Sequence, residues 1–399
     1  MECGPLRADS SFSGVISMKK RPVPQRARKI RCLQRVLAPL LAVIAGAVPA
    51  FFMPVPSVSA AELPQVSAQS AVVLHMDSGE ILYEKNAREQ RAVASTTKIM
   101  TALLTLEAAA LENPEVEITQ EMVLVEGSSM GLRAGDRLTL RDLAAGMLLA
   151  SGNDAANAAA IAVGGSVEKF VARMNQRAGE LGLSDTHFET PSGLDGETHY
   201  STALDMAKLG SAAMSNPDFA EIAGSQSMQV RFLSPEKTVT YQNHNKLLSR
   251  YEGCTGVKTG AERDGVRLVA VTLHAPDDWN DHEKLLDYGF SQMTTLTFDD
   301  SSYACQAPVA GVGEIDVIGG TEPQTAAVPV AQQGAVQRIV ELPRFLYAPV
   351  RKGEQVGRVR YCLAGKTVAE VSLLAAEEAF LPEKRSWWES LLAFFSGSG

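Results

Sequence analysis

The order of strand-like and helix-like segments is the feature that most limits how this chain can fold. Residues 71–76 and 81–83 flank a polar turn at residues 77–80 and have the apolar character of a β-hairpin. Far downstream, residues 266–273 form a nearly continuous apolar run, as in a buried strand, and residues 281–290 are helix-like. The intervening sequence is mainly helical. We therefore expect an α/β (α+β) fold, with a sheet built from both ends of this region, flanking helices and an all-helical insert.

The middle of the chain contains helical segments separated by short polar breaks. Residues 138–163 are rich in Ala and Leu and are interrupted at residues 150–154, which indicates a tight turn between two helices. Residues 188–195 read as a loop and residues 202–214 as a further helix. Residues 230–241 are typical of an irregular hairpin.

Composition changes at about Thr295. From there to about Leu381, short β-like runs alternate with Gly and Pro, which indicates a small separate β-domain. We expect a main domain at residues 61–294 and a β-rich domain at residues 295–383. The β-like runs are residues 309–317, 336–342, 356–363 and 367–374.

The two ends of the chain suggest export and a membrane contact. Residues 1–36 contain nine Lys and Arg, an apolar run follows, and small residues end it near Ala60, as in a removable export signal. An uncleaved membrane anchor is the alternative. Residues 384–399 are short, aromatic and amphipathic after two basic residues, which suits a helix lying on a membrane surface. The alternative for this tail is packing on the β-domain.

Charge and cysteine content exclude some classes of function. Without residues 1–60, 28 Lys and Arg stand against 44 Asp and Glu, a formal net charge near −16, which disfavours nucleic-acid binding. Cys254, Cys305 and Cys362 remain, with no metal-ligand spacing, and the histidines show no H-x-x-x-H pair. We expect no cofactor. A Cys305–Cys362 disulfide is conceivable in an exported protein, but three buried thiols are the preferred interpretation.

Ser95 and Lys98 are the first candidate catalytic pair. In Ser95-x-x-Lys98, at the start of an apolar helical run, residues three apart share a helix face, so the Lys98 amine can reach the Ser95 hydroxyl. A neutral Lys98 could then act as the base that activates the serine. The same spacing occurs elsewhere in the chain, and Ser95 could merely cap a helix.

Two further motifs, Ser151-Gly152-Asn153 and Lys258-Thr259-Gly260, make the set specific. With Ser95-x-x-Lys98 they stand in the order of the serine penicillin-recognising enzymes. The chain resembles the low-molecular-weight penicillin-binding proteins that act as D-alanyl-D-alanine carboxypeptidases, peptidase family S11. The resemblance covers about residues 65–294 strongly and implies a sheet like that of β-lactamases and DD-peptidases.

The resemblance also implies roles for the first two motifs. Ser95 would attack the bond between the terminal D-alanines of a peptidoglycan stem pentapeptide and form an acyl-enzyme. Lys98 would be the general base and Ser151 a proton relay to the leaving amine. Asn153 would hydrogen-bond the substrate backbone or Lys98.

The third motif would bind the substrate's end. By resemblance, Lys258 and Thr259 bind the terminal carboxylate, and the N–H after Gly260, at Ala261, completes an oxyanion hole with the Ser95 N–H. β-Lactam inhibitors would acylate Ser95, and the protein would work at the outer face of the cytoplasmic membrane or in the cell wall.

One departure from the family pattern follows Gly260. Relatives continue with about a dozen residues and a further strand, whereas here the turn-like residues 261–265 follow at once. We therefore expect a central strand to be missing and the wall beside the oxyanion hole to be altered. The alternative functions are a catalytically impaired homologue that binds wall peptides and, with less support, a serine β-lactamase.

Overall fold

The structure is a computed structural model that describes residues 62–194, 196–256 and 260–382. The export signal expected at residues 1–60 and the anchor expected at residues 384–399 lie outside the described residues. Within the described part, no helix is both long and apolar enough to cross a bilayer.

A five-stranded antiparallel sheet, in the order β2-β1-β9-β8-β7, forms the centre of the first part of the chain. The N-terminal hairpin supplies β1 and β2 and the distant segment supplies the rest, so the expected α/β sheet built from both ends is confirmed. Its strands are β1 (Ser70–His75), β2 (Ile81–Lys85), β7 (Cys254–Gly256), β8 (Gly260–Arg263) and β9 (Val266–Leu273).

Both faces of this sheet are covered by helices. Along β1, alternate side chains point to opposite sides. Val72 and Leu74 join the core of the helical region, whereas Ala71 and Val73 join a second core. Helix α6 packs on β1 and β9 in the first core and α9 packs on them in the second. β1 is therefore buried along its whole length.

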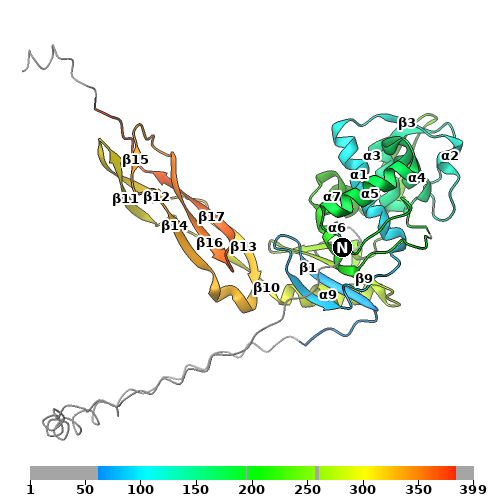
Figure 1. The fold of residues 1–399 in the computed structure, drawn as a ribbon, viewed down its shortest axis with the longest axis horizontal. Helices are drawn as coiled ribbons and strands as arrows, with labels where there is room; N and C mark the ends of the chain where they lie inside the picture. Colours follow the sequence, from blue (N-terminus) through cyan, green and yellow to red (C-terminus); the bar gives the residue numbers. More distant parts are fainter. Residues whose placement is uncertain (1–61, 195, 257–259, 383–399) are drawn as a thin grey trace, which may run out of the picture. The chain divides into compact units, whose positions relative to one another are not determined.

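The all-helical insert is also present, and Figure 1 shows α1, α3, α4, α5 and α7 gathered into one group. The expected break at residues 150–154 is the junction between α3 and α4, where Ser151 adopts a left-handed conformation. The helices are α1 (Lys98–Leu111), α2 (Gln120–Val123), α3 (Leu140–Ala150), α4 (Asn153–Gly164), α5 (Val167–Glu180), α6 (Ala203–Met214), α7 (Pro217–Gly224), α8 (Leu247–Arg250) and α9 (Asp278–Ser291). Two small hairpin-like pairs accompany them: β3 (Glu115–Glu117) with β4 (Arg137–Thr139), and β5 (Ser227–Leu233) with β6 (Glu236–Gln242).

The expectation of a missing central strand is wrong. Gly260–Arg263, of which residues 261–263 were expected to belong to a turn, forms β8 and fills the place between β7 and β9. The turn is only Asp264-Gly265, where both residues have positive φ, as in the two-residue type I′ hairpin. The sheet thus keeps its strand order by using a strand of four residues.

The β-rich domain has a core of its own, which includes Val317, Val359 and Leu373. Its main sheet has the order β14-β16-β17-β12-β11-β15. The run at residues 309–317, expected as one strand, is instead the end of β11, a turn and most of β12. The strands are β10 (Met293–Phe298), β11 (Ala304–Ala310), β12 (Gly313–Gly319), β13 (Gln324–Pro329), β14 (Gln337–Glu341), β15 (Leu346–Tyr347), β16 (Gln355–Leu363) and β17 (Lys366–Ala375).

The three cysteines of the described part are free thiols. Cys362 is buried, whereas Cys254 and Cys305 are half-buried. The interpretation as thiols is confirmed and the Cys305–Cys362 disulfide is not formed, but the expected burial is wrong for Cys254 and Cys305.

Candidate active site

Ser95 lies in a short 3₁₀ turn, η1 (Ala94–Thr97), directly before α1. The preceding residue, Ala94, has a φ of +44°, an uncommon conformation for a residue with a Cβ. The turn leaves Ser95 exposed and buries Lys98. The nucleophile candidate is therefore accessible and the base candidate is not.

Lys98 is held between Ser95 and a backbone carbonyl. Its Nζ donates to Ser95 Oγ at 3.2 Å and to the Ser192 carbonyl at 2.9 Å. The side chain is only 2% exposed, and this burial lowers the pKa of Lys98 from 10.5 to about 8. Desolvation disfavours the ammonium form, so about a tenth of the Lys98 amine is neutral at pH 7.

The loop after α5 packs against η1 and the start of α1. Thr101 Oγ1 donates to the Pro191 carbonyl at 2.6 Å. Gly193, with a φ of +81°, lies so close to the Ala94 carbonyl oxygen that a Cβ there would be 1.9 Å away. Only glycine fits this approach.

A buried histidine fixes the other side of the turn. The Glu189 N–H donates to His199 Nδ1 at 3.1 Å, so the proton of the neutral ring is on Nε2, which donates to Thr97 Oγ1 at 2.8 Å. Burial lowers the pKa of His199, which favours this neutral form.

The second motif enters the site only in part. Ser151 is in the left-handed conformation, and the Ser128 hydroxyl donates to its carbonyl at 2.5 Å. Ser151 lines the cavity beside Ser95. Asn153 is 3% exposed and donates to the Glu126 carbonyl, and it is not among the described residues that line the cavity. Its Nδ2 group holds the loop before Ser128, whereas its buried Oδ1 has no hydrogen-bond partner within the described part, and its expected contact with substrate or Lys98 stays a prediction.

Sequence reasoning missed Asp154, the residue after the motif. Its buried carboxylate accepts from the backbone N–H groups of Met130 (2.9 Å), Gly131 (3.1 Å) and Leu132 (2.9 Å), and from the Ser129 hydroxyl (2.6 Å). It thus fixes the loop that contacts Ser151. An acid in the first turn of a helix is a weak signal on its own, because many such residues only complement the helix dipole.

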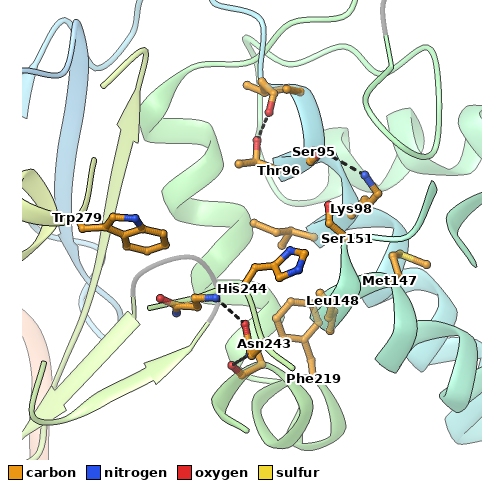
Figure 2. Close-up of a pocket in the computed structure, with 15 residues that line it drawn as sticks. Ser95, Thr96, Lys98, Met147, Leu148, Ser151, Phe219, Asn243, His244 and Trp279 are labelled. Carbon is orange, nitrogen blue, oxygen red and sulfur yellow. Dashed lines mark hydrogen bonds between the residues drawn. The ribbon is translucent and has the colours of Figure 1, made fainter. Parts of the chain in front are cut away.

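A cavity of about 370 Å³ opens next to Ser95 and Lys98 (Figure 2). Trp279 from the first turn of α9 and His244 from the segment after β6 take part in its wall, and neither was among the expected site residues. The described residues lining it are Val93, Ala94, Ser95, Thr96, Lys98, Ile99, Met147, Leu148, Ser151, Phe219, Ala223, Asn243, His244, Asn245 and Trp279.

Only the end of the third motif lies within the described residues. Lys258 and Thr259 lie outside the described residues. Gly260 and Ala261 belong to β8, an inner strand, and Ala261 is 1% exposed. The Glu262 N–H donates to the Gly253 carbonyl on the β7 side, so the Ala261 N–H points to the opposite side, toward β9. The oxyanion-hole role of Ala261 stays a prediction, and this direction of its N–H, into the sheet, does not favour it.

Comparison with known proteins identifies the family. Residues 57–276 match the D-alanyl-D-alanine carboxypeptidase family, peptidase S11, and residues 295–379 match the penicillin-binding protein 5 C-terminal domain. The chain belongs to this family of carboxypeptidases. Its class is that of the serine D-Ala-D-Ala carboxypeptidases acting on peptidoglycan, among the low-molecular-weight penicillin-binding proteins.

Individual relatives agree with this assignment over most of their length. D-alanyl-D-alanine carboxypeptidase DacF of Bacillus subtilis is 32% identical over 336 residues, which span 78% of this chain and 85% of the relative. DacC of Escherichia coli is 33% identical over 79% of this chain and 85% of its own. The crystal structure of penicillin binding protein 5 from Haemophilus influenzae aligns with a TM-score of 0.57 at 27% identity, covering 80% of this carboxypeptidase and 99% of that chain.

Proposed function

We propose that this protein removes the C-terminal D-alanine from peptidoglycan stem pentapeptides through an acyl-enzyme on Ser95. The observation that carries the proposal is the Lys98 amine, 3.2 Å from the exposed Ser95 hydroxyl and with a pKa of about 8. Neutral Lys98 takes the hydroxyl proton as Ser95 Oγ attacks the peptide carbonyl. The C–N bond then breaks, D-alanine leaves with a proton, and water hydrolyses the ester.

Ser151 is proposed as the relay that passes the proton to the leaving amine. It lines the same cavity as Ser95 and Lys98, and Figure 2 draws it beside Lys98. Its left-handed backbone is held by Ser128, so its position depends on the loop that Asp154 fixes. The Ser95 N–H remains the proposed donor to the oxyanion, and Lys258 and Thr259 remain the proposed partners of the substrate carboxylate.

A second candidate is a homologue that binds wall peptides but turns them over slowly. The direction of the Ala261 N–H, toward β9, favours this candidate. With that N–H turned away, the Ser95 N–H would be the one backbone donor proposed for the oxyanion. Loss of one such donor typically slows acylation about 10²–10³-fold. β-Lactams would still acylate Ser95, but slowly.

The test is intact mass of the residue 61–399 protein after incubation with penicillin, followed by release of D-alanine from a pentapeptide. The Ser95→Ala variant is the control. A penicilloyl adduct on the wild type together with D-alanine release supports the carboxypeptidase. An adduct without release, with retained binding of the pentapeptide, supports the second candidate. A folded protein that forms no adduct contradicts the Ser95 mechanism.

We also propose that residues 1–60 direct export, that residues 61–294 and 295–383 are the two domains, and that residues 384–399 anchor the protein to the outer face of the cytoplasmic membrane. The basic and apolar pattern before Ala60 and the amphipathic tail support this. Fractionation of cells that express the full chain, with and without residues 384–399, tests it. Tail deletion should move the protein from the membrane to the soluble exported fraction.

A further inference from the structure

The exposed aromatic side chains of the described residues are concentrated at one end of the β-rich domain. They are Phe345 (49% exposed), Tyr347 (74%) and Phe380 (54%). Two exposed aliphatic side chains, Val312 and Leu381, lie there too. We call these five residues the aromatic tip. The other aromatic residues of residues 62–382 for which burial is described are buried or half-buried, so within that part this exposure is confined to one place.

The tip is assembled from three separate segments around the turn at Gly311. β15 pairs with the end of β11, which sets Tyr347 opposite Ala310 (Figure 1). A Cβ on Gly311 would lie 3.2 Å from the Leu381 side chain, so the last described residues also reach this turn. Phe345 packs edge-to-face on Tyr347, with ring centroids 5.3 Å apart. These contacts hold the aromatic side chains at the surface although water solvates them poorly.

We propose that the aromatic tip inserts into the interface of a phospholipid bilayer, next to the anchoring tail. Phe and Tyr side chains with apolar neighbours suit the boundary between headgroups and acyl chains. The amphipathic segment that begins at Lys384 is separated from Leu381 by only Pro382 and Glu383, so a membrane that holds this segment also meets the tip. The inference rests on the proposed membrane anchoring.

Charge at this end of the domain contributes little to the contact. Three exposed basic residues and four exposed acidic residues lie close in sequence to the tip: Arg344, Arg351 and Lys352, and Glu314, Glu354, Glu377 and Glu378. These opposite charges largely balance. The apolar side chains must therefore supply most of the affinity, and the binding should depend only weakly on salt.

The experiment measures binding of the residue 61–399 protein to vesicles of phosphatidylethanolamine and phosphatidylglycerol by co-sedimentation. The test variant carries Phe345→Ser, Tyr347→Ser and Phe380→Ser. The matched control carries Ile339→Ser and Val340→Ser, which are exposed apolar residues on β14, at the opposite edge of the same sheet. We expect the tip variant to lose about tenfold in partition coefficient, as exposed aromatic residues are removed from an interface, and the control to stay within about twofold.

A variant truncated after Pro382 lacks the tail, so it separates the contribution of the tip to vesicle binding from that of the tail. It should bind more weakly than the full protein, and the tip substitutions should weaken it further. Hydrogen exchange of the unmodified protein gives an independent readout that needs no variant, since peptides covering residues 345–347 and 380–381 should become protected on vesicles.

Three outcomes would overturn the inference. One is unchanged partition of the tip variant with unchanged exchange in these peptides. Another is loss of binding on tail deletion alone, which leaves the anchoring proposal intact and removes the tip from it. The third is a dimer in sedimentation that the tip substitutions dissociate, because the tip would then bind a second copy. No vesicle binding by any form would instead contradict the anchoring proposal itself.

Discussion

Burial of Lys98 makes its amine a better base for Ser95 and at the same time lowers the stability of the folded protein at neutral pH. The pKa of Lys98 is lowered from 10.5 to about 8 because the folded protein desolvates its ammonium group. A fall of this size corresponds to about 3 kcal/mol. Between pH 8 and 10.5 the unfolded chain binds more protons than the folded one, so this contribution makes the protein more stable as pH rises through that window.

The acylation rate should follow the neutral fraction of Lys98. With a pKa of about 8, about a tenth of the amine is neutral at pH 7, and the rate of penicillin acylation should rise roughly tenfold per pH unit below 8 and level off above it. Stopped-flow acylation between pH 6 and 10 measures this profile. A rate that is independent of pH between 6 and 9 would show that Lys98 is not the base.

The close approach of Gly193 to η1, the turn that carries Ser95, can be tested by substituting Gly193 and, as a control, a second glycine. Gly193→Ala would put a methyl group 1.9 Å from the Ala94 carbonyl oxygen and 2.7 Å from Thr97 Oγ1, so the turn must move. We expect a loss of about 3 kcal/mol or more in the free energy of unfolding and a large fall in penicillin acylation.

Gly182→Ala is the control for this change. Gly182 also has a positive φ, +67°, but nothing lies within 4 Å of the new methyl group. It should cost only about 1 kcal/mol, as expected for a left-handed alanine, and leave acylation unchanged. Equal losses in denaturant unfolding of the two variants would mean that backbone conformation, and not the contact with Ala94, dominates at Gly193.

The extent to which single residues could be predicted depended on how local their partners are. Ser95 and Lys98 are three residues apart, so sequence spacing alone brought them together. Trp279 and His244 reach the cavity through packing of distant segments, which no local pattern encodes. The role expected of Ala261 was carried over from relatives with a longer segment, whereas here the residue lies in a four-residue inner strand, so that role stays a prediction.

At the scale of elements, the hairpin of β8 and β9 explains how the five-stranded sheet forms although few residues lie between β7 and β9. Asp264-Gly265 closes the hairpin with two residues of positive φ, so Gly260–Arg263 is free to extend as a strand. The hairpin at β1 and β2 and the break between α3 and α4 followed from local turn chemistry and could be predicted. The conversion of a turn-like stretch into β8 could not, because it is the position between β7 and β9 that makes these residues a strand.

The first turn of α9 should select among β-lactams through Trp279. In the cavity beside Ser95 this half-buried indole can pack on an aromatic acyl side chain of a ligand. Trp279→Ala should lower the acylation efficiency of benzylpenicillin by about tenfold and that of 6-aminopenicillanic acid, which lacks the phenyl group, by less than about twofold.

Trp279→Phe is the matched variant and should keep most of the preference for benzylpenicillin, because an aromatic face remains. Second-order acylation rates for both compounds decide the matter. An equal fall for the two compounds would mean that Trp279 supports the site structurally and does not contact the side chain of the ligand.

At the scale of the whole molecule, the apolar cores are separate. The buried residues of the β-rich domain form one cluster between Phe298 and Ala379, distinct from the clusters on either face of the catalytic sheet. A fold built in this way should not unfold in a single step, because loss of one core leaves the buried area of the others largely intact.

Two Leu→Ala variants test this independence. Leu373 in β17 and Leu106 in α1 are both fully buried, but in different cores. Each substitution should cost about 2–5 kcal/mol in its own domain. In calorimetry, Leu373→Ala should lower one transition and Leu106→Ala the other, and penicillin acylation at 25 °C should be unchanged in Leu373→Ala. A single transition that both variants lower equally would mean that the two cores unfold together, and slower acylation in Leu373→Ala would mean that the β-rich domain supports the active site.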